Sequence, residues 1–335
     1  MKKYEVVRTI LGERWNTAAQ SSVKSAFAPT NIALCKYWGK RDEEINLPLT
    51  SSLSISLGTK GTTTELKLNG KDHDEIFLNG NVIANDSPFG LGLFEYLNLF
   101  RYEQTPRLTI NLTTNIPIAA GLASSACGFA SLVLALDGLF DWQLSQDELS
   151  ILARLGSGSA CRSIWSGFVH WHAGIRSDGM DSHGESLRAR WPDLCIGLLI
   201  FSEREKSIPS RVAMQRTLTT SALYQAWPSK VSRDLAAIKQ AIGNRDFQLM
   251  GKSAESNAAT MHATMLSAWP PIIYSIPQTL IAMQKIWDLR NEGLQLYFTQ
   301  DAGPNLKLLF LARDIDNVKA HFPTIEIIQP FEPGL

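Results

Sequence analysis

The sequence lacks an excess of charge of either sign, since 32 Lys and Arg residues balance 32 Asp and Glu residues in a chain of 335. A nucleic-acid-binding domain usually carries a basic excess, so we expect no nucleic-acid partner. Apolar runs that could span a bilayer are also missing, because none approaches the roughly 20 residues required. Charged residues from Lys2 to Arg14 interrupt any apolar core near the N-terminus, which argues against a signal peptide. We therefore expect no association with a membrane.

Cysteine is scarce and shows no paired pattern. The four cysteines, Cys35, Cys127, Cys161 and Cys195, lie far apart and form no Cys-x-x-Cys motif. Such spacing is typical of reduced thiols in a cytoplasmic protein. The sequence accordingly predicts a cytoplasmic location.

The overall composition, with 44% hydrophobic and 19% charged residues, is typical of a globular protein. A chain of this length is long for one compact core, so two domains are expected. Strand patterns dominate the first half and helical patterns the second, which favours two α+β domains over a doubly wound sheet. Trp191-Pro192-Asp193 is a candidate junction. We predict an N-terminal extension over residues 1–22, a first domain over 23–192 and a second over 193–335.

Local patterns predict several elements. The apolar run before Phe140 predicts a buried helix over about 124–140. Ser145-x-x-Glu148 is a capping box that opens a helix ending near Leu155. Alternating residues predict two strands, 52–57 and 62–68, joined by a loop at 58–64 that could act as a lid, as could 203–211. Further helices are expected over about 210–225, 229–242, 246–267 and 275–291.

The most informative segment is the small-residue turn from Pro117 to Ala126, which enters the first predicted helix. Helix N-terminal N–H groups lack partners and the helix dipole favours negative charge there, so phosphate can bind. The small residues Gly121 and Ala123, on either side of Leu122, let a phosphate approach the backbone, and the hydroxyls of Ser124 and Ser125 can reach phosphate or Mg²⁺. Taken alone, the turn fits a tightly packed strand-to-helix connection equally well.

Three other segments hold residues that packing alone does not require: 28–40, 157–163 and 301–305. The first combines Lys, Tyr, Trp and Asn near a strand end, where snorkelling lysines are the simpler explanation. The second sets Arg162 among small and hydroxyl residues, which suits bidentate binding of carboxylate or phosphate, although a helix-linking loop would also fit. The third places Asp301 directly after an apolar strand, where the Asp could also cap its own turn.

Two further patterns are weaker evidence for a functional site. Gly251-Lys252-Ser253 imitates the end of a P-loop, but Asp246 stands where the first glycine is required, and the segment lies within a helical pattern. His170 and His172 share one face of a predicted strand and could bind a metal. Because no third ligand is near them in sequence, a packed or solvent-facing pair is favoured.

Four motifs together resemble the diphosphomevalonate decarboxylases of the GHMP kinase superfamily, in the order that this family shows. They are Lys36-Tyr37-Trp38-Gly39-Lys40, Ala120-Gly121-Leu122-Ala123-Ser124-Ser125-Ala126, Gly156-Ser157-Gly158-Ser159-Ala160-Cys161-Arg162-Ser163 and Asp301-Ala302-Gly303-Pro304-Asn305. The resemblance implies a first domain like domain 2 of ribosomal protein S5, a ferredoxin-like second domain and a cleft between them. It also implies a homodimer that uses ATP and Mg²⁺ to convert mevalonate 5-diphosphate into isopentenyl diphosphate, CO₂, ADP and phosphate, in the mevalonate pathway of isoprenoid biosynthesis.

The resemblance also implies roles for individual residues. Asp301 would act at the 3-hydroxyl as a base or orienting acceptor, with Lys36 setting its ionisation, Arg162 pairing with the substrate carboxylate and Asn31 orienting the phosphoryl-transfer site. The substrate-binding set is Tyr37, Lys40, Ser157, Ser159, Arg162, Ser210 and Arg211. Gly121, Leu122, Ala123, Ser124 and Ser125 would bind ATP, and the two serines Mg²⁺. The chain departs from the family at Pro209 and Ala213.

Two alternatives remain at this stage. One is a sister enzyme, a 3-kinase or decarboxylase acting on mevalonate or mevalonate 5-phosphate. A 3-kinase would be expected to lose the role of Asp301 or Lys36, and a monophosphate enzyme needs fewer groups around the phosphates. The other is a non-catalytic binding protein, which predicts erosion of the acid, the arginine or the turn.

Overall fold

The computed structural model describes residues 1–102, 104–116, 124–204 and 206–331, and these form the α+β fold expected, built on two main sheets. The first sheet runs in the order β6-β5-β7-β4-β8-β9, and β1 pairs with β4 beside this path. Its strands are β1 (Val23–Cys35), β4 (Ser52–Leu68), β5 (Glu75–Leu78), β6 (Asn81–Ile83), β7 (Leu108–Thr114), β8 (Phe168–Trp171) and β9 (Gly184–Ser186). A small ribbon of β2 (Lys40–Asp42) and β3 (Leu47–Pro48) lies apart from this sheet.

The prediction of a loop at 58–64 is wrong, because β4 is one continuous strand through these residues. Its first part pairs with β8 and its second with β7, while β1 runs along its other side. Gly58 lies at φ 60°, and a Cβ at Gly61 would approach the Ala28 carbonyl oxygen to 2.1 Å. Gly58 and Gly61 thus let one long strand change partners beside β1.

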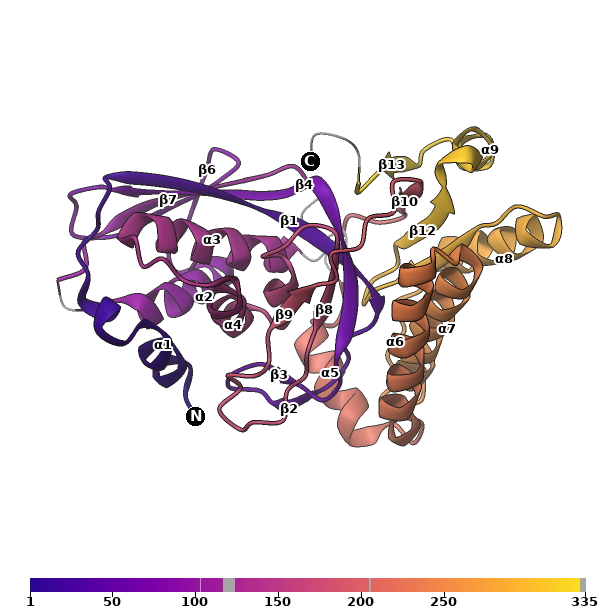
Figure 1. The fold of residues 1–335 in the computed structure, drawn as a ribbon, viewed down its shortest axis with the longest axis horizontal. Helices are drawn as coiled ribbons and strands as arrows, with labels where there is room; N and C mark the ends of the chain where they lie inside the picture. The colour runs from indigo at the N-terminus through magenta and orange to yellow at the C-terminus, as the bar shows by residue number, and fades with distance from the viewer. Residues whose placement is uncertain (103, 117–123, 205, 332–335) are drawn as a thin grey trace.

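Helices α3 (Ser124–Phe140) and α4 (Gln146–Gly156) cover one face of this sheet together with α2 (Pro88–Leu97), and α3 contacts both β1 and β4 (Figure 1). Both α3 and α4 begin where predicted. Ser145 accepts a hydrogen bond from the backbone N–H of Glu148, and the Glu148 carboxylate accepts one from the Ser145 N–H, which completes the capping box.

A helix also forms within the first 22 residues, where no element was expected. Helix α1 (Lys3–Leu11) buries Val6, Val7, Ile10 and Leu11 in the main core and contacts α4. The 3-10 turn that follows it (Gly12–Asn16) buries Trp15. The segment is therefore packed into the first half of the molecule.

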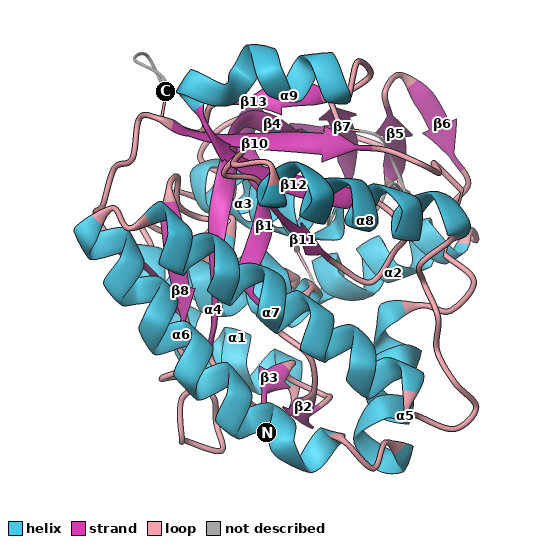
Figure 2. Ribbon diagram, turned by 90° about the vertical axis from the view of Figure 1, so that its right-hand side faces the viewer, coloured by secondary structure: helices cyan, strands magenta, loops and turns pink. Residues whose placement is uncertain are grey.

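The second half has an antiparallel sheet in the order β11-β12-β10-β13. Its strands are β10 (Leu194–Leu199), β11 (Tyr297–Gln300), β12 (Leu306–Leu311) and β13 (Glu326–Ile328), and its helices are α5 (Ser210–Thr220), α6 (Trp227–Asn244), α7 (Phe247–Leu266), α8 (Pro277–Asn291) and α9 (Ile315–His321). Helices α6 and α7 contact β1, so β1 lies between them and α3 (Figures 1 and 2). No helix in the described part of the chain is both long and apolar enough to cross a membrane.

Candidate active site

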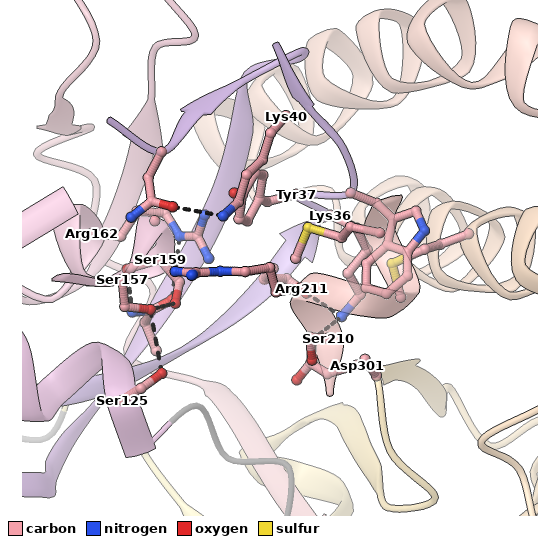
Figure 3. Close-up of a pocket in the computed structure, with 18 of the residues that line it drawn as sticks. Lys36, Tyr37, Lys40, Ser125, Ser157, Ser159, Arg162, Ser210, Arg211 and Asp301 are labelled. Atoms are coloured by element: carbon pink, nitrogen blue, oxygen red, sulfur yellow. Dashed lines mark hydrogen bonds and ion pairs between the residues drawn. The ribbon is translucent and has the colours of Figure 1, made fainter. Parts of the chain in front are cut away.

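The segments singled out in the sequence meet around a cavity of about 380 Å³ (Figure 3). It lies between the C-terminal end of β1, the 3-10 turn after α4, the start of α5 and the loop after β11. The predicted site residues that line it are Asn31, Lys36, Tyr37, Lys40, Ser125, Ser157, Ser159, Arg162, Ser210, Arg211 and Asp301. Gly121, Leu122 and Ala123 lie outside the described residues, and for Ser124 only its place at the start of α3 is described.

Asp301 sits at the end of β11 between two lysines. The Lys36 Nζ lies 2.7 Å from Asp301 Oδ1, and the Lys307 Nζ lies 3.0 Å from Oδ2. Burial alone would raise the pKa of Asp301, but the two cations lower it well below its usual range. The carboxyl group is therefore ionised whenever the protein is folded near neutral pH.

Lys307 was missed by the sequence analysis, although a signal was present. It interrupts the apolar run Leu306–Leu311 of β12, where its side chain is almost fully buried. A lysine in a buried strand requires a partner, and Asp301 supplies one across the tight loop that joins β11 to β12.

Lys36 is held in place by backbone and side-chain partners. Its Nζ donates to the Ala33 carbonyl at 2.8 Å as well as to Asp301, and its backbone N–H donates to Asn257 Oδ1 at 2.8 Å. Burial lowers the pKa of the Lys36 ammonium, and the Asp301 carboxylate acts in the opposite direction. Next to this pair, His262 Nε2 lies 3.1 Å from the Asp301 carbonyl oxygen, and burial lowers the pKa of His262 to about 4.

The turn that carries Lys36 to Lys40 is anchored by the second half of the chain. The Trp38 carbonyl accepts hydrogen bonds from the Tyr224 hydroxyl at 2.7 Å and from the Trp227 indole N–H at 3.0 Å. Gly39 has φ 117°, and a Cβ there would overlap the Tyr224 hydroxyl. This explains why the motif has glycine between Trp38 and Lys40.

Arg162 is buried and oriented by two side chains from β1 and β4. Its Nε donates to Asn31 Oδ1 at 3.2 Å, and its Nη1 donates to Ser52 Oγ at 2.7 Å. Asn31 is fixed in turn, because its Nδ2 donates to Ser163 Oγ at 2.7 Å. Trp171 lies 5.6 Å below the guanidinium. A guanidinium held this rigidly is suited to bidentate binding of a carboxylate.

A second group of polar side chains lines the other side of the cavity. Figure 3 shows Arg211 reaching from α5 toward Ser157 and Ser159. Lys40 Nζ donates to Asn46 Oδ1 at 2.6 Å, and the pKa of Lys40 is lowered to about 8 by burial and by the Arg211 charge. The Tyr37 hydroxyl is buried and has no hydrogen-bond partner among the described residues. These cations and hydroxyls suit a polyanion.

Helix α5 begins at Ser210 despite the departures from the family pattern next to it. Pro209 is the N-cap residue with an extended backbone, and Ala213 is fully buried. Lys206, which was not among the predicted site residues, donates to Ser210 Oγ at 2.9 Å and also lines the cavity. Burial lowers the pKa of Lys206.

A second, mostly apolar cavity of about 320 Å³ adjoins the first near the start of α3 and shares Ser125 and Phe129 with it. Phe89, Leu93 and Leu112 are among its lining residues. Ser125 Oγ lies 3.3 Å from Ser157 Oγ, between the two cavities. An apolar pocket beside hydroxyls at a helix N-terminus fits a nucleotide, with the base in the pocket and Mg²⁺ and phosphate at the oxygen ligands.

Comparison with known proteins identifies relatives along most of the chain. Residues 28–184 match the diphosphomevalonate decarboxylase-like N-terminal domain, and residues 196–329 match the mevalonate 5-diphosphate decarboxylase C-terminal domain. Diphosphomevalonate decarboxylase mvd1 of Aspergillus fumigatus is 38% identical over 312 residues, which cover 87% of this chain and 77% of the relative.

Solved structures agree with this match. Mevalonate diphosphate decarboxylase from Staphylococcus aureus has a TM-score of 0.86 at 35% identity, covering 92% of this chain and 95% of that one. The enzyme from Enterococcus faecalis has a TM-score of 0.84 at 37% identity, with 92% and 97% covered. A structure of MDDEF in complex with MVAPP, AMPPCP and magnesium has a TM-score of 0.86 at 38% identity, with the same coverage.

Proposed function

This chain belongs to the diphosphomevalonate decarboxylase family, and we propose that its larger cavity holds mevalonate 5-diphosphate between Asp301, Arg162 and Arg211. It is an enzyme that decarboxylates mevalonate 5-diphosphate at the expense of ATP, with Mg²⁺, to give isopentenyl diphosphate. The observation that carries the proposed arrangement is the ionised Asp301, fixed by Lys36 and Lys307 in the cavity that also contains Arg162.

Asp301 orients the 3-hydroxyl of the substrate and stabilises positive charge at the tertiary carbon. A carboxylate whose pKa lies far below neutral is a weak base, so complete removal of the hydroxyl proton is not its main contribution. Phosphoryl transfer depends chiefly on alignment and electrostatics, which a fixed carboxylate supplies. When phosphate then leaves, the negative charge of Asp301 favours the developing cation.

Arg162 holds the carboxylate that is lost as CO₂. Its Nε and Nη1 are oriented by Asn31 and Ser52, so the guanidinium presents a fixed edge to the cavity. The electrons of the breaking carbon–carbon bond form the double bond to the tertiary carbon as phosphate leaves. Asn31 acts in this arrangement through Arg162.

The substrate diphosphate binds on the opposite side of the cavity. Arg211 and Lys40 supply positive charge there, and hydroxyl donors converge from both halves of the chain. They are Tyr37, Ser157, Ser159 and Ser210. This full set favours a diphosphate over a monophosphate substrate.

The start of α3 binds the phosphates of ATP, which supplies the phosphoryl group. Ser125 lies between the two cavities and is suited to hold Mg²⁺ or phosphate, with Ser124 and the residues Gly121, Leu122 and Ala123 beside it in sequence. The apolar pocket next to Phe129 takes the nucleoside.

A release assay with carboxyl-labelled substrates tests the function directly. With ATP and Mg²⁺, we expect labelled CO₂ from mevalonate 5-diphosphate and little from mevalonate or mevalonate 5-phosphate. A strong preference for the monophosphate would instead assign the chain to the sister activity.

We also propose that the enzyme is a cytoplasmic homodimer. Its four cysteines are buried and none of them forms a disulfide, as expected of a reducing compartment. Apolar side chains remain exposed in the second half at Leu266, Trp269, Ile273 and Ile281, and such a surface favours self-association. Sedimentation velocity tests the dimer, and a single species at the 37.1 kDa mass of one chain would contradict it.

A further inference from the structure

A cluster of potential metal ligands lies on β8 and β9, outside the cavity described above. His170 and His172 alternate along β8 and just beyond it, and His170 is directly paired with Glu185 of β9. Trp171, between the two histidines, points to the other face of the sheet, where it contacts Tyr37 and Arg162 of the active site. Since successive side chains of a strand point to opposite faces, the cluster lies on the face of the sheet opposite the catalytic cavity.

The ligand atoms of these three residues all lie within 4.8 Å of one another. His172 Nε2 is 2.7 Å from Glu185 Oε2, and the two histidine rings are 4.0 Å apart. Around a tetrahedral zinc ion, with bonds of about 2.0–2.1 Å, ligand atoms stand roughly 3.3 Å apart. Only small side-chain shifts separate the present arrangement from that geometry.

His170 gives a second and independent indication. It is 6% exposed, and neither of its ring nitrogens has a hydrogen-bond partner among the described residues. In its neutral form, an imidazole has one ring nitrogen with a free lone pair that can bind a ligand. A buried polar group without a partner calls for a ligand, and neutral imidazole is a preferred ligand of zinc-type ions.

We propose that His170, His172 and Glu185 form a binding site for a divalent ion of the zinc class, distinct from the Mg²⁺ used in the reaction. Two imidazoles and one carboxylate match the ligands of zinc sites, whereas Mg²⁺ prefers oxygen ligands. The bound ion joins the edge strand β9 to β8 and replaces the hydrogen bond between His172 and Glu185. A water molecule completes the coordination.

Untagged, full-length enzyme that has been dialysed against a chelator is titrated with Zn²⁺ in competition with a chromophoric chelator. We expect one tight Zn²⁺ per chain and a rise in Tm, with no comparable effect of Mg²⁺. His172→Gln and Glu185→Gln, both at accessible positions, should each weaken Zn²⁺ binding by at least about tenfold, while CO₂ release with Mg²⁺ stays unchanged.

His73→Gln is the matched control, because His73 Nδ1 also lies 2.7 Å from a carboxylate, that of Asp72, but at an exposed site that is not part of the cluster. This variant should bind Zn²⁺ as the unaltered enzyme does. The proposal fails if no stoichiometric Zn²⁺ binds. It also fails if binding survives both His172→Gln and Glu185→Gln, or is lost equally in His73→Gln.

Discussion

Asp301 is the residue on which the proposed chemistry depends most directly. Asp301→Asn keeps the size of the side chain but removes its negative charge, so orientation of the hydroxyl and stabilisation of the cation are both lost. We expect CO₂ release to fall by about 10²- to 10⁴-fold, while ATP binding and thermal unfolding change little. Near-normal release from the pure variant would refute the role assigned to Asp301.

We predict that Lys307 influences the reaction through its ion pair with Asp301. Because the Lys307 ammonium lowers the pKa of Asp301, Lys307→Met should raise it, and protonation will then remove the active carboxylate at a higher pH. The acid limb of the kcat/KM profile is expected to shift upward in pH. Lys319→Met, at an exposed position on α9, is the control and should leave the profile in place. A uniform loss of rate with an unmoved acid limb would indicate a purely structural role for Lys307.

The sequence located Asp301, Lys36, Arg162 and Asn31, but it did not locate Lys307 and Ser52, which also hold these side chains in place. Asp301, Lys36 and Arg162 could be found because each stands in a short motif. Ser52 could not, since it meets Arg162 from a position 110 residues away in the chain. Ser52 reaches Arg162 because β4 pairs with β1 and with β8. This pairing joins distant parts of the chain, so no local sequence pattern predicts it.

At the scale of single elements, local sequence signals correctly placed a helix where a capping motif or a clear apolar pattern was present. The helix opened by the Ser145 capping box begins as predicted, and so does the buried helix that ends at Phe140. Helix α1 was missed because it has only nine residues, although Val6, Val7, Ile10 and Leu11 recur at helical spacing. Strand β4 was divided in two because the alternation that predicts a strand is interrupted between Leu57 and Thr62. The structure shows that Gly61 is needed there for close approach to β1.

Helix α1 should contribute to stability as a part of the main core. Leu11 is 1% exposed in that core, so Leu11→Ala leaves a cavity and is expected to lower the free energy of unfolding by about 2–5 kcal/mol. Urea denaturation followed by tryptophan fluorescence measures the change. Tyr4→Ala, at an exposed position of the same helix, should stay within about 0.5 kcal/mol. Equal effects of the two changes would mean that α1 is not packed as described.

At the scale of the whole molecule, the substrate cavity exists only because the two halves of the chain meet. Ser157 and Ser159 come from the turn after α4, whereas Ser210 and Arg211 come from the start of α5, and all four line one cavity. Helices α6 and α7 pack against β1 and thereby hold the halves together. Under the proposed arrangement, selectivity for a diphosphate depends on Arg211, a cation that the second half contributes to a cavity largely built by the first.

Arg211→Gln tests that dependence. Loss of a charge-assisted hydrogen bond worth ~1.5–3 kcal/mol should raise KM for mevalonate 5-diphosphate by about 10- to 150-fold. The effect on kcat should be smaller, because the proposed arrangement places Arg211 at the diphosphate and away from the reacting carbon. The preference for diphosphate over monophosphate should fall in parallel, since the monophosphate lacks the outer phosphate. Arg233→Gln, at an exposed position on α6 that does not line the cavity, is the control and should leave both values unchanged. An unaltered preference in Arg211→Gln would place the diphosphate elsewhere in the cavity, and the cation of the second half would then have no part in substrate selection.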